Sequence, residues 1–191
     1  MADTSPGQLF RDEELVAPPY DWRKFTFVCL VHILLVVGTV LWVLDYFVVT
    51  WRSVAMGVGW FVVSSTAITA GYHRLFSHAA YRATRPVELF FLITGASAFQ
   101  GTALQWSAQH RDHHTFVDQP KDPYNIYMGF WFAHMGWVVR QTKPNYDRVK
   151  DLQKSALIWW QYKLYYPLAF FLSFGLPAAI GLLWGETLGA L

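Results

Sequence analysis

The sequence predicts an all-α integral membrane protein with three spanning helices. Hydrophobic residues make up 54% of the 191 residues and aromatic residues 18%, which is more apolar than a typical soluble domain. These residues are gathered in long blocks instead of being spread along the chain. A helix needs about 20 apolar residues to cross the hydrocarbon core of a bilayer, and three blocks come close to or exceed that length.

The first expected span covers residues 25–49, with Trp22 and Trp51 as interfacial anchors at its ends. The second covers residues 53–71, where Ser, Thr and Gly suit close packing between helices. The third covers residues 164–184 and contains two prolines that neighbouring helices can accommodate.

Basic residues predict the orientation of these spans. Every Lys and Arg except Arg52 lies in the first 24 residues or between Arg74 and Lys163. Positive charge stays on the cytoplasmic side, so we expect a cytoplasmic leader at residues 1–24 and a cytosolic cap at about 72–156. The charge is an orientation signal and not the footprint of a nucleic-acid-binding protein.

The leader and one further apolar block are not assigned to the spans. The leader has no basic region before a short apolar stretch, so we expect no secretory signal, and a short helix is expected around Gln8–Val16. Its brevity favours a bacterial plasma membrane, with the endoplasmic reticulum as the alternative. The block Val87–Leu104 would put histidine clusters on opposite sides if it crossed the bilayer; we expect a buried or membrane-dipping helix instead.

Five of the seven histidines form two clusters. In the first, His73 and His78 are five residues apart, and on an α-helix they would point about 140° away from each other. We therefore expect the helix to end between them. In the second, His110, His113 and His114 share one face of a helix. Five imidazoles exceed what one zinc ion normally takes from a protein, so the clusters fit part of a two-metal site.

Other polar side chains are assigned around these clusters. Asp112, Asp118 and Asp122 are available to accept hydrogen bonds from ligand imidazoles. His32 stands alone in the first span and is expected to be structural. His134 lies in an aromatic-rich stretch and is expected to pack at an amphipathic surface, with a metal-ligand role as the alternative.

The motifs resemble those of acyl-CoA delta-9 (stearoyl-CoA type) desaturases, a family of membrane-bound histidine-box enzymes. GYHRLFSH at residues 71–78 looks like the first histidine box, and AFQGTALQWSAQHRDHH at residues 98–114 looks like the second box with its lead-in. The similarity continues through residues 122–125, 134–137 and 184–187. A membrane domain of this family would cover residues 25–191.

The resemblance implies an oxidoreductase of unsaturated fatty acid biosynthesis that inserts a cis double bond into an acyl chain. It implies two iron ions held by His73, His78, His110, His113 and His114 with further ligands, and molecular oxygen as co-substrate. It also implies a fatty acyl-CoA or acyl-lipid substrate, and cytochrome b5 or ferredoxin as electron donor. An unactivated C–H bond has no acidic proton for a base to remove, so a metal oxidant suits this chemistry.

The resemblance also implies substrate-binding residues. In the family the acyl chain lies in a kinked tunnel beneath the irons, and Gln100 and Trp106 match positions that line it. Phe61 and Ser65 would lie near its closed end. Arg140 and Lys143 follow the GW motif and could bind phosphate, although a solvated face near anionic lipid explains them equally well.

The sequence departs from the family pattern at two places. The family has a fourth span, a further histidine and a third HxxHH box, which the sequence does not contain. The metal site is therefore expected to be incomplete and the chain alone inactive. Residues 107–109 lack the Arg-Asp pair that animal members place before the second box, which leaves the head group of the substrate open.

Three alternative functions remain at this stage. A related histidine-box hydroxylase of alkanes or lipids would share the metal chemistry and leave an alcohol. A membrane metal-binding or transport protein would place its polar residues at the bilayer midplane, whereas the clusters here lie at the ends of apolar segments. An inactive, truncated gene product is the third alternative.

Overall fold

The computed structural model describes residues 15–186, and the regular elements in that range are helices. Three helical stretches are long and apolar enough to cross a bilayer: Trp22–Val43, Trp51–Ser77 and Ala156–Leu183. This confirms the prediction of an all-helical integral membrane protein with three spanning helices. The helix expected in the leader lies largely outside the described residues.

Helix α1 (Trp22–Val43) has no buried residue, as expected for a helix that meets lipid. It begins at Trp22 instead of Phe25 because the Asp21 carboxylate accepts the N–H of Arg23 at 3.2 Å and caps the first turn. It ends at Val43 instead of Val49, since Asp45 adopts a positive φ of 58°, which an α-helix cannot include.

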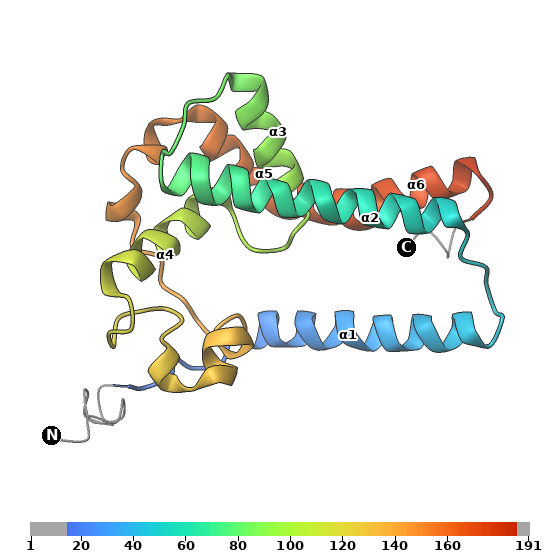
Figure 1. Cartoon of the computed structure of the whole chain (residues 1–191), viewed down its shortest axis with the longest axis horizontal. Helices are drawn as coiled ribbons and strands as arrows, with labels where there is room; N and C mark the ends of the chain where they lie inside the picture. Colours follow the sequence, from blue (N-terminus) through green and yellow to red (C-terminus); the bar gives the residue numbers. More distant parts are fainter. Residues whose placement is uncertain (1–14, 187–191) are drawn as a thin grey trace, which may run out of the picture. The chain divides into compact units, whose positions relative to one another are not determined.

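The second long helix consists of two parts with different winding. Helix α2 (Trp51–Thr66) continues directly into the π-helical segment η3 (Ala67–Ser77) (Figure 1). At its start, the Glu186 carboxylate accepts the hydroxyls of Thr50 and Ser53 and the N–H of Thr50. These hydrogen bonds, that of the Thr50 hydroxyl first, lower the pKa of the Glu186 carboxyl.

The apolar block at 87–104 does not form a spanning helix. Helix α3 (Arg85–Ala96) has 12 residues, too few to cross a bilayer, and its Phe91 and Leu92 are buried. The chain then leaves the helical conformation, with Phe99 and Gly101 at positive φ, and helix α4 (Ala103–Phe116) begins.

The remaining helices complete the chain. The third span consists of α5 (Ala156–Phe170), the π-helical segment η8 (Phe171–Gly175) and α6 (Leu176–Leu183). Pro167 lies inside α5, and Pro177 lies in the first turn of α6, where a missing N–H costs little. Four short helices connect α4 to α5: η4 (Ile126–Met128), η5 (Phe132–Gly136), η6 (Tyr146–Val149) and η7 (Leu152–Lys154).

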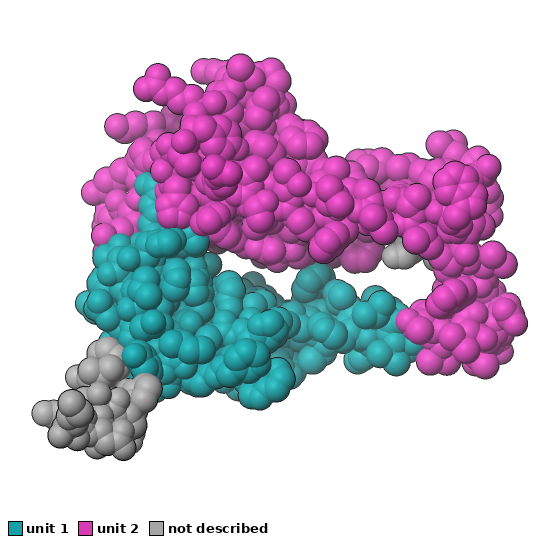
Figure 2. Space-filling model, in the orientation of Figure 1, with its two compact units in different colours: residues 1–37, 109–145 teal, residues 38–108, 146–191 magenta. Residues whose placement is uncertain are grey.

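The chain divides into two compact units, which Figure 2 shows in different colours. Unit 1 comprises residues 1–37 and 109–145, and unit 2 comprises residues 38–108 and 146–191, so α1 and α4 each contribute to both. In unit 2, α3 packs against η3 and α5 around the main hydrophobic core. The largest side chains fully buried there include Tyr72, Leu92, Leu104 and Ile158.

Candidate metal centre

The first histidine cluster is built by the π-helical winding of η3. In a π-helix each N–H bonds to the carbonyl five residues earlier, and the N–H of His78 donates to the carbonyl of His73 at 3.1 Å. Residues five apart therefore lie one turn above each other, and the two imidazole centroids are 4.7 Å apart. The helix ends between them, at Ser77, as predicted, but the π-helical winding brings the rings together and not a turn of the chain.

Trp106 of α4 lies beside this cluster within unit 2. Its indole is 6.0 Å from the imidazole of His73, centroid to centroid, and 6.3 Å from the ring of Tyr72. The indole N–H donates to the side-chain oxygen of Gln100 at 3.1 Å. Two residues that the family resemblance placed together are therefore in direct contact, next to the first cluster.

The start of α4 is fixed by a capping box. The Thr102 hydroxyl accepts the N–H of Gln105 at 3.1 Å, and the Gln105 side chain accepts the N–H of Thr102 at 3.4 Å. This reciprocal pair satisfies two of the N–H groups that a helix leaves free at its beginning. The sequence spacing Thr-x-x-Gln carried this signal, which our sequence analysis did not use.

Two residues of α5 hold the same helix start from the other side. The Tyr165 hydroxyl accepts the N–H of Gly101 at 2.9 Å, and the Gln161 side-chain oxygen accepts the N–H of Ala103 at 3.2 Å. The Gln161 amide also donates to the Tyr72 hydroxyl at 2.8 Å. Gln161 is fully buried and connects the helix carrying the first cluster to the helix carrying the second. Sequence reasoning missed it.

The second cluster lies on α4, as predicted. The Nε2 atoms of His110 and His114 are 3.0 Å apart, and their ring centroids are 4.5 Å apart. Two bonds of about 2.1 Å at right angles would separate two ligand nitrogens by about 3 Å, so this pair has the spacing of ligands on one ion. The ring of His113 lies farther off, 6.3 Å from His110 and 5.5 Å from His114.

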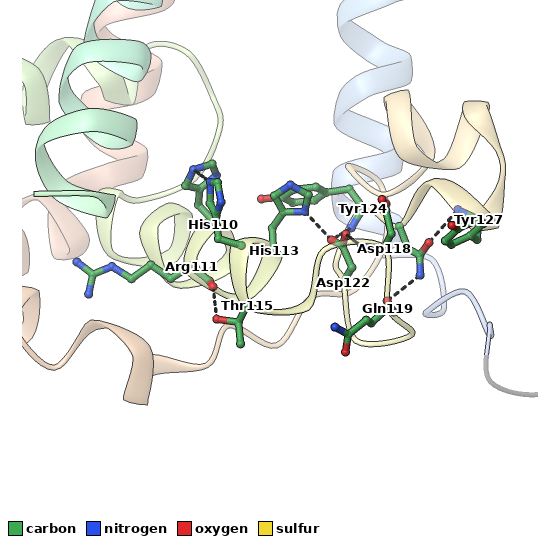
Figure 3. Close-up of polar contacts among 11 residues, drawn as sticks. His110, Arg111, His113, Thr115, Asp118, Gln119, Asp122, Tyr124 and Tyr127 are labelled. Carbon is green, nitrogen blue, oxygen red and sulfur yellow. Dashed lines mark hydrogen bonds and ion pairs between the residues drawn. The ribbon is translucent and has the colours of Figure 1, made fainter. Parts of the chain in front are cut away.

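The buried carboxylate of Asp122 fixes the orientation of His113 (Figure 3). One carboxylate oxygen lies 2.8 Å from Nδ1 of His113, and the other accepts the N–H of Asp118 at 2.9 Å. Of the three aspartates considered from the sequence, Asp122 meets a box histidine through its side chain. A carboxylate on Nδ1 leaves Nε2 as the nitrogen that can bind a metal.

The loop that carries Asp122 is itself well ordered by hydrogen bonds. The Asn125 amide donates to the carbonyl of Gln119 at 2.7 Å, and its oxygen accepts the N–H of Tyr127 at 2.8 Å. The ring of Tyr124 lies 4.5 Å from that of His113. Burial, and then the negative charges of nearby aspartates, raise the pKa of the Tyr124 phenol well above its usual value, so it stays neutral beside the histidine.

The other residues singled out from the sequence lie as follows. Phe61 is exposed and Ser65 half-buried on α2. Lys143 lines a small pocket of unit 1, of about 190 Å³, together with Arg140. The Arg140 guanidinium lies 3.7 Å above the ring of Tyr20 and donates to the carbonyl of Pro18 at 3.0 Å.

The two isolated histidines have partners of their own. Nδ1 of His32 lies 2.7 Å from the carbonyl of Val28, one turn earlier on α1. The ring of His134 stacks on that of Phe130, with a centroid distance of 5.4 Å and an interplanar angle of 8°. Both contacts agree with the structural roles that we expected.

No family model matches the chain, but curated proteins do. Stearoyl-CoA desaturase 4 of Mus musculus is 38% identical over 189 residues, which cover 93% of this chain and 52% of the relative. Stearoyl-CoA desaturase of Homo sapiens is 33% identical over 188 residues, covering 93% and 51%. A delta(9)-fatty-acid desaturase of Caenorhabditis elegans is 32% identical over 194 residues, covering 95% and 56%. The chain spans about half the length of these curated relatives.

Proposed function

Because the chain belongs to the acyl-CoA (stearoyl-CoA, delta-9) desaturase family, we propose that it carries part of the catalytic centre of an oxygen-dependent fatty acyl desaturase. The observation that carries the proposal is the winding of η3, which turns a five-residue spacing into a pair of adjacent imidazoles. A family assignment alone would not explain why an uncommon helix type occurs at this position.

The proposed centre takes its ligands from both clusters. His73, His78, His110 and His114 each offer one ring nitrogen, and His113, with Nδ1 held by Asp122, offers a fifth. The continuity of helix α4 supports the proposal that these nitrogens belong to one site. Trp106 lies against His73 within unit 2, and His110 follows Trp106 by about one turn of α4.

The donor set fits a pair of first-row metal ions. Imidazole is a good ligand for iron, zinc and copper, and five neutral imidazoles are more than one zinc usually takes from a protein. The family assignment and the oxidation chemistry favour iron, in two ions. When bound, the ions would supply the oxidant that abstracts hydrogen from an unactivated methylene.

The chain's own residues would position the substrate. Trp106 and Gln100 form a hydrogen-bonded wall beside the first cluster, which would present one C–C bond of the acyl chain to the metals and exclude water. Phe61 and Ser65 lie two to three turns before His73 on the same continuous helix. Bulk at these positions would limit the length of the acyl chain.

The pocket of unit 1 is the proposed site of the polar head group. Arg140 and Lys143 line it, together with Gln109 and Asp112. A coenzyme A ester would suit these cations as phosphate partners. Cytochrome b5 or ferredoxin is the proposed electron donor, and the cytoplasmic side is the proposed side for the clusters, because the basic residues concentrate around them.

Metal analysis of histidine variants tests the proposal directly. The purified chain, loaded with Fe²⁺ without oxygen and then desalted, should retain iron, and His73→Ala and His114→Ala should lower the iron content severalfold. His32→Ala is the matched control, since His32 contacts its own helix in the first span. Failure of the wild-type chain to retain iron, or equal loss in the control, would overturn the metal assignment.

Product analysis separates desaturation from the alternatives. With stearoyl-CoA, oxygen and a reduced electron donor, a complete desaturase forms the monounsaturated acyl chain and the related hydroxylase forms an alcohol, so the assay is run on this chain alone, which we expect to form neither, and on this chain joined to the C-terminal half of a curated relative. Uptake of metal into sealed vesicles would instead indicate a transporter. Detection of the alcohol as the main product would replace our proposal with the hydroxylase.

A further inference from the structure

An exposed aromatic segment lies in the stretch that the sequence assigns to the cytosolic cap. We call residues 126–137, which include η5, the aromatic turn. Four of its large apolar side chains are exposed: Ile126 by 46%, Phe130 by 62%, Trp131 by 76% and Met135 by 45%. Burying such a side chain away from water is worth about 1.5–3 kcal/mol, so leaving these four side chains in contact with water would be unfavourable.

The backbone of the aromatic turn is compatible with an apolar environment. The N–H of Ala133 donates to the carbonyl of Gly129 at 3.1 Å, and the N–H of Trp137 donates to the carbonyl of Phe132 at 3.1 Å. Helical hydrogen bonds of this kind are what a backbone needs before it can enter lipid.

The chain that follows the turn is fixed to the beginning of α1 within unit 1. The N–H of Asp21 donates to the carbonyl of Val139, and the N–H of Gln141 donates to the carbonyl of Pro19, each at 2.9 Å. The Lys24 ammonium donates to the carbonyl of Arg140 at 3.0 Å. These contacts hold residues 139–141 at the end of a spanning helix.

The beginning of α1 is itself an interfacial surface. The rings of Tyr20, Trp22 and Phe25 contact one another with centroids 5.6–5.8 Å apart, and the exposed fraction of Trp22 is 68%. Aromatic side chains of this kind gather at the level of the lipid headgroups. The aromatic turn is therefore separated by only a few residues from chain that lies at the membrane surface.

We infer that the aromatic turn is a membrane-embedded segment that seats residues 126–143 in the lipid headgroup region. Lipid is the occupant that the surroundings favour, because residues 139–141 are hydrogen-bonded to the beginning of α1, where exposed aromatic side chains suit the level of the lipid headgroups. The inference does not depend on the proposed enzymatic activity.

Site-specific quenching in nanodiscs of phosphatidylcholine and phosphatidylglycerol tests the inference. In a Cys29→Ser background, Trp131→Cys and Met135→Cys would each carry a bimane label, with Gln119→Cys as an exposed control in the same unit. Lipids with a spin label near the headgroup should quench the first two labels severalfold more than the control. Water-soluble iodide should show the reverse order.

Each outcome decides the matter. Iodide quenching of positions 131 and 135 equal to that of position 119 would overturn the inference. So would protection from both quenchers that depends on protein concentration, because that result would indicate a second copy of the chain. Agreement between two labelled positions guards against a local effect of either substitution, and iron retention by the same samples reports separately on the proposed metal centre.

Discussion

Replacing Gln161 with methionine should lower the free energy of unfolding by about 2–3 kcal/mol. The side chain makes two fully buried hydrogen bonds, to the Tyr72 hydroxyl and to the N–H of Ala103, and methionine can form neither. A buried polar group left without a partner costs about 1–3 kcal/mol, while hydrogen bonds between membrane helices average about 0.6 kcal/mol. We expect the loss of the bond to the Ala103 N–H to cost an amount in the higher range, because the N–H groups at a helix start have no acceptor within the helix. The loss of the bond to the Tyr72 hydroxyl should cost an amount in the lower range, because this hydroxyl can rotate.

Denaturant unfolding of the chain in mild detergent measures this change. Tyr72→Phe removes one of the two bonds and should cost about 1 kcal/mol. The double variant should cost less than the sum of the two single variants, since both delete the same bond. Gln141→Met is the matched control, because its side chain is exposed and its effect should stay within about 0.5 kcal/mol. A Gln161→Met protein as stable as the control, or strict additivity with Tyr72→Phe, would refute the reasoning.

Three further predictions concern separate parts of the chain. Asp122→Asn should weaken Fe²⁺ or Co²⁺ binding by about 10–100-fold in a metal titration, because loss of a carboxylate partner of a ligand histidine has that effect; unchanged affinity would remove Asp122 from the centre. Gly95→Ala should lower the free energy of unfolding by about 1–3 kcal/mol, since the added Cβ would lie 2.5 Å from Cε1 of Tyr72. Gly57→Ala is the control in the same unfolding assay: a Cβ at position 57 meets nothing within 4 Å, and the substitution should be neutral. The lowered pKa of Glu186 predicts that the ionised carboxylate stabilises the fold fully above the usual glutamate pKa of about 4.3. This stabilisation should be lost as the pH falls through the lower pKa of the folded state. The thermal unfolding temperature should show that pH dependence in the wild type and not in Glu186→Gln.

The sequence predicted the spans because composition and block length decide them, but it could not fix their ends. The start of α1 depends on the capping carboxylate of Asp21, and its end depends on the left-handed backbone at Asp45. Both are single-residue effects of about 1 kcal/mol, which hydrophobicity averaged over a span does not register.

The second histidine cluster was predictable because three- and four-residue spacings fit the period of an α-helix. The geometry of the first cluster was not, because we took the same period for granted and expected a turn of the chain, not a change of winding, to bring His73 and His78 together. The five-residue spacing was itself the signal, since it matches the hydrogen-bond step of a π-helix. Gln161 offered a weaker signal: an amide in a largely apolar helix needs a partner, but the sequence does not say which.

The π-helical winding and the position of α4 are stabilised by the same side chains. The Ser77 hydroxyl donates to the carbonyl of Tyr72, five residues earlier in η3, at 2.7 Å, and lies 3.0 Å from the Ser107 hydroxyl of α4. Tyr72 in turn accepts from Gln161, which also holds Ala103. A π-helix is less stable than an α-helix and occurs mostly as short functional insertions, so its cost must be offset by tertiary contacts. Because those contacts also dock the beginning of α4, one buried network stabilises both the winding that pairs His73 with His78 and the position of Ala103 and Ser107.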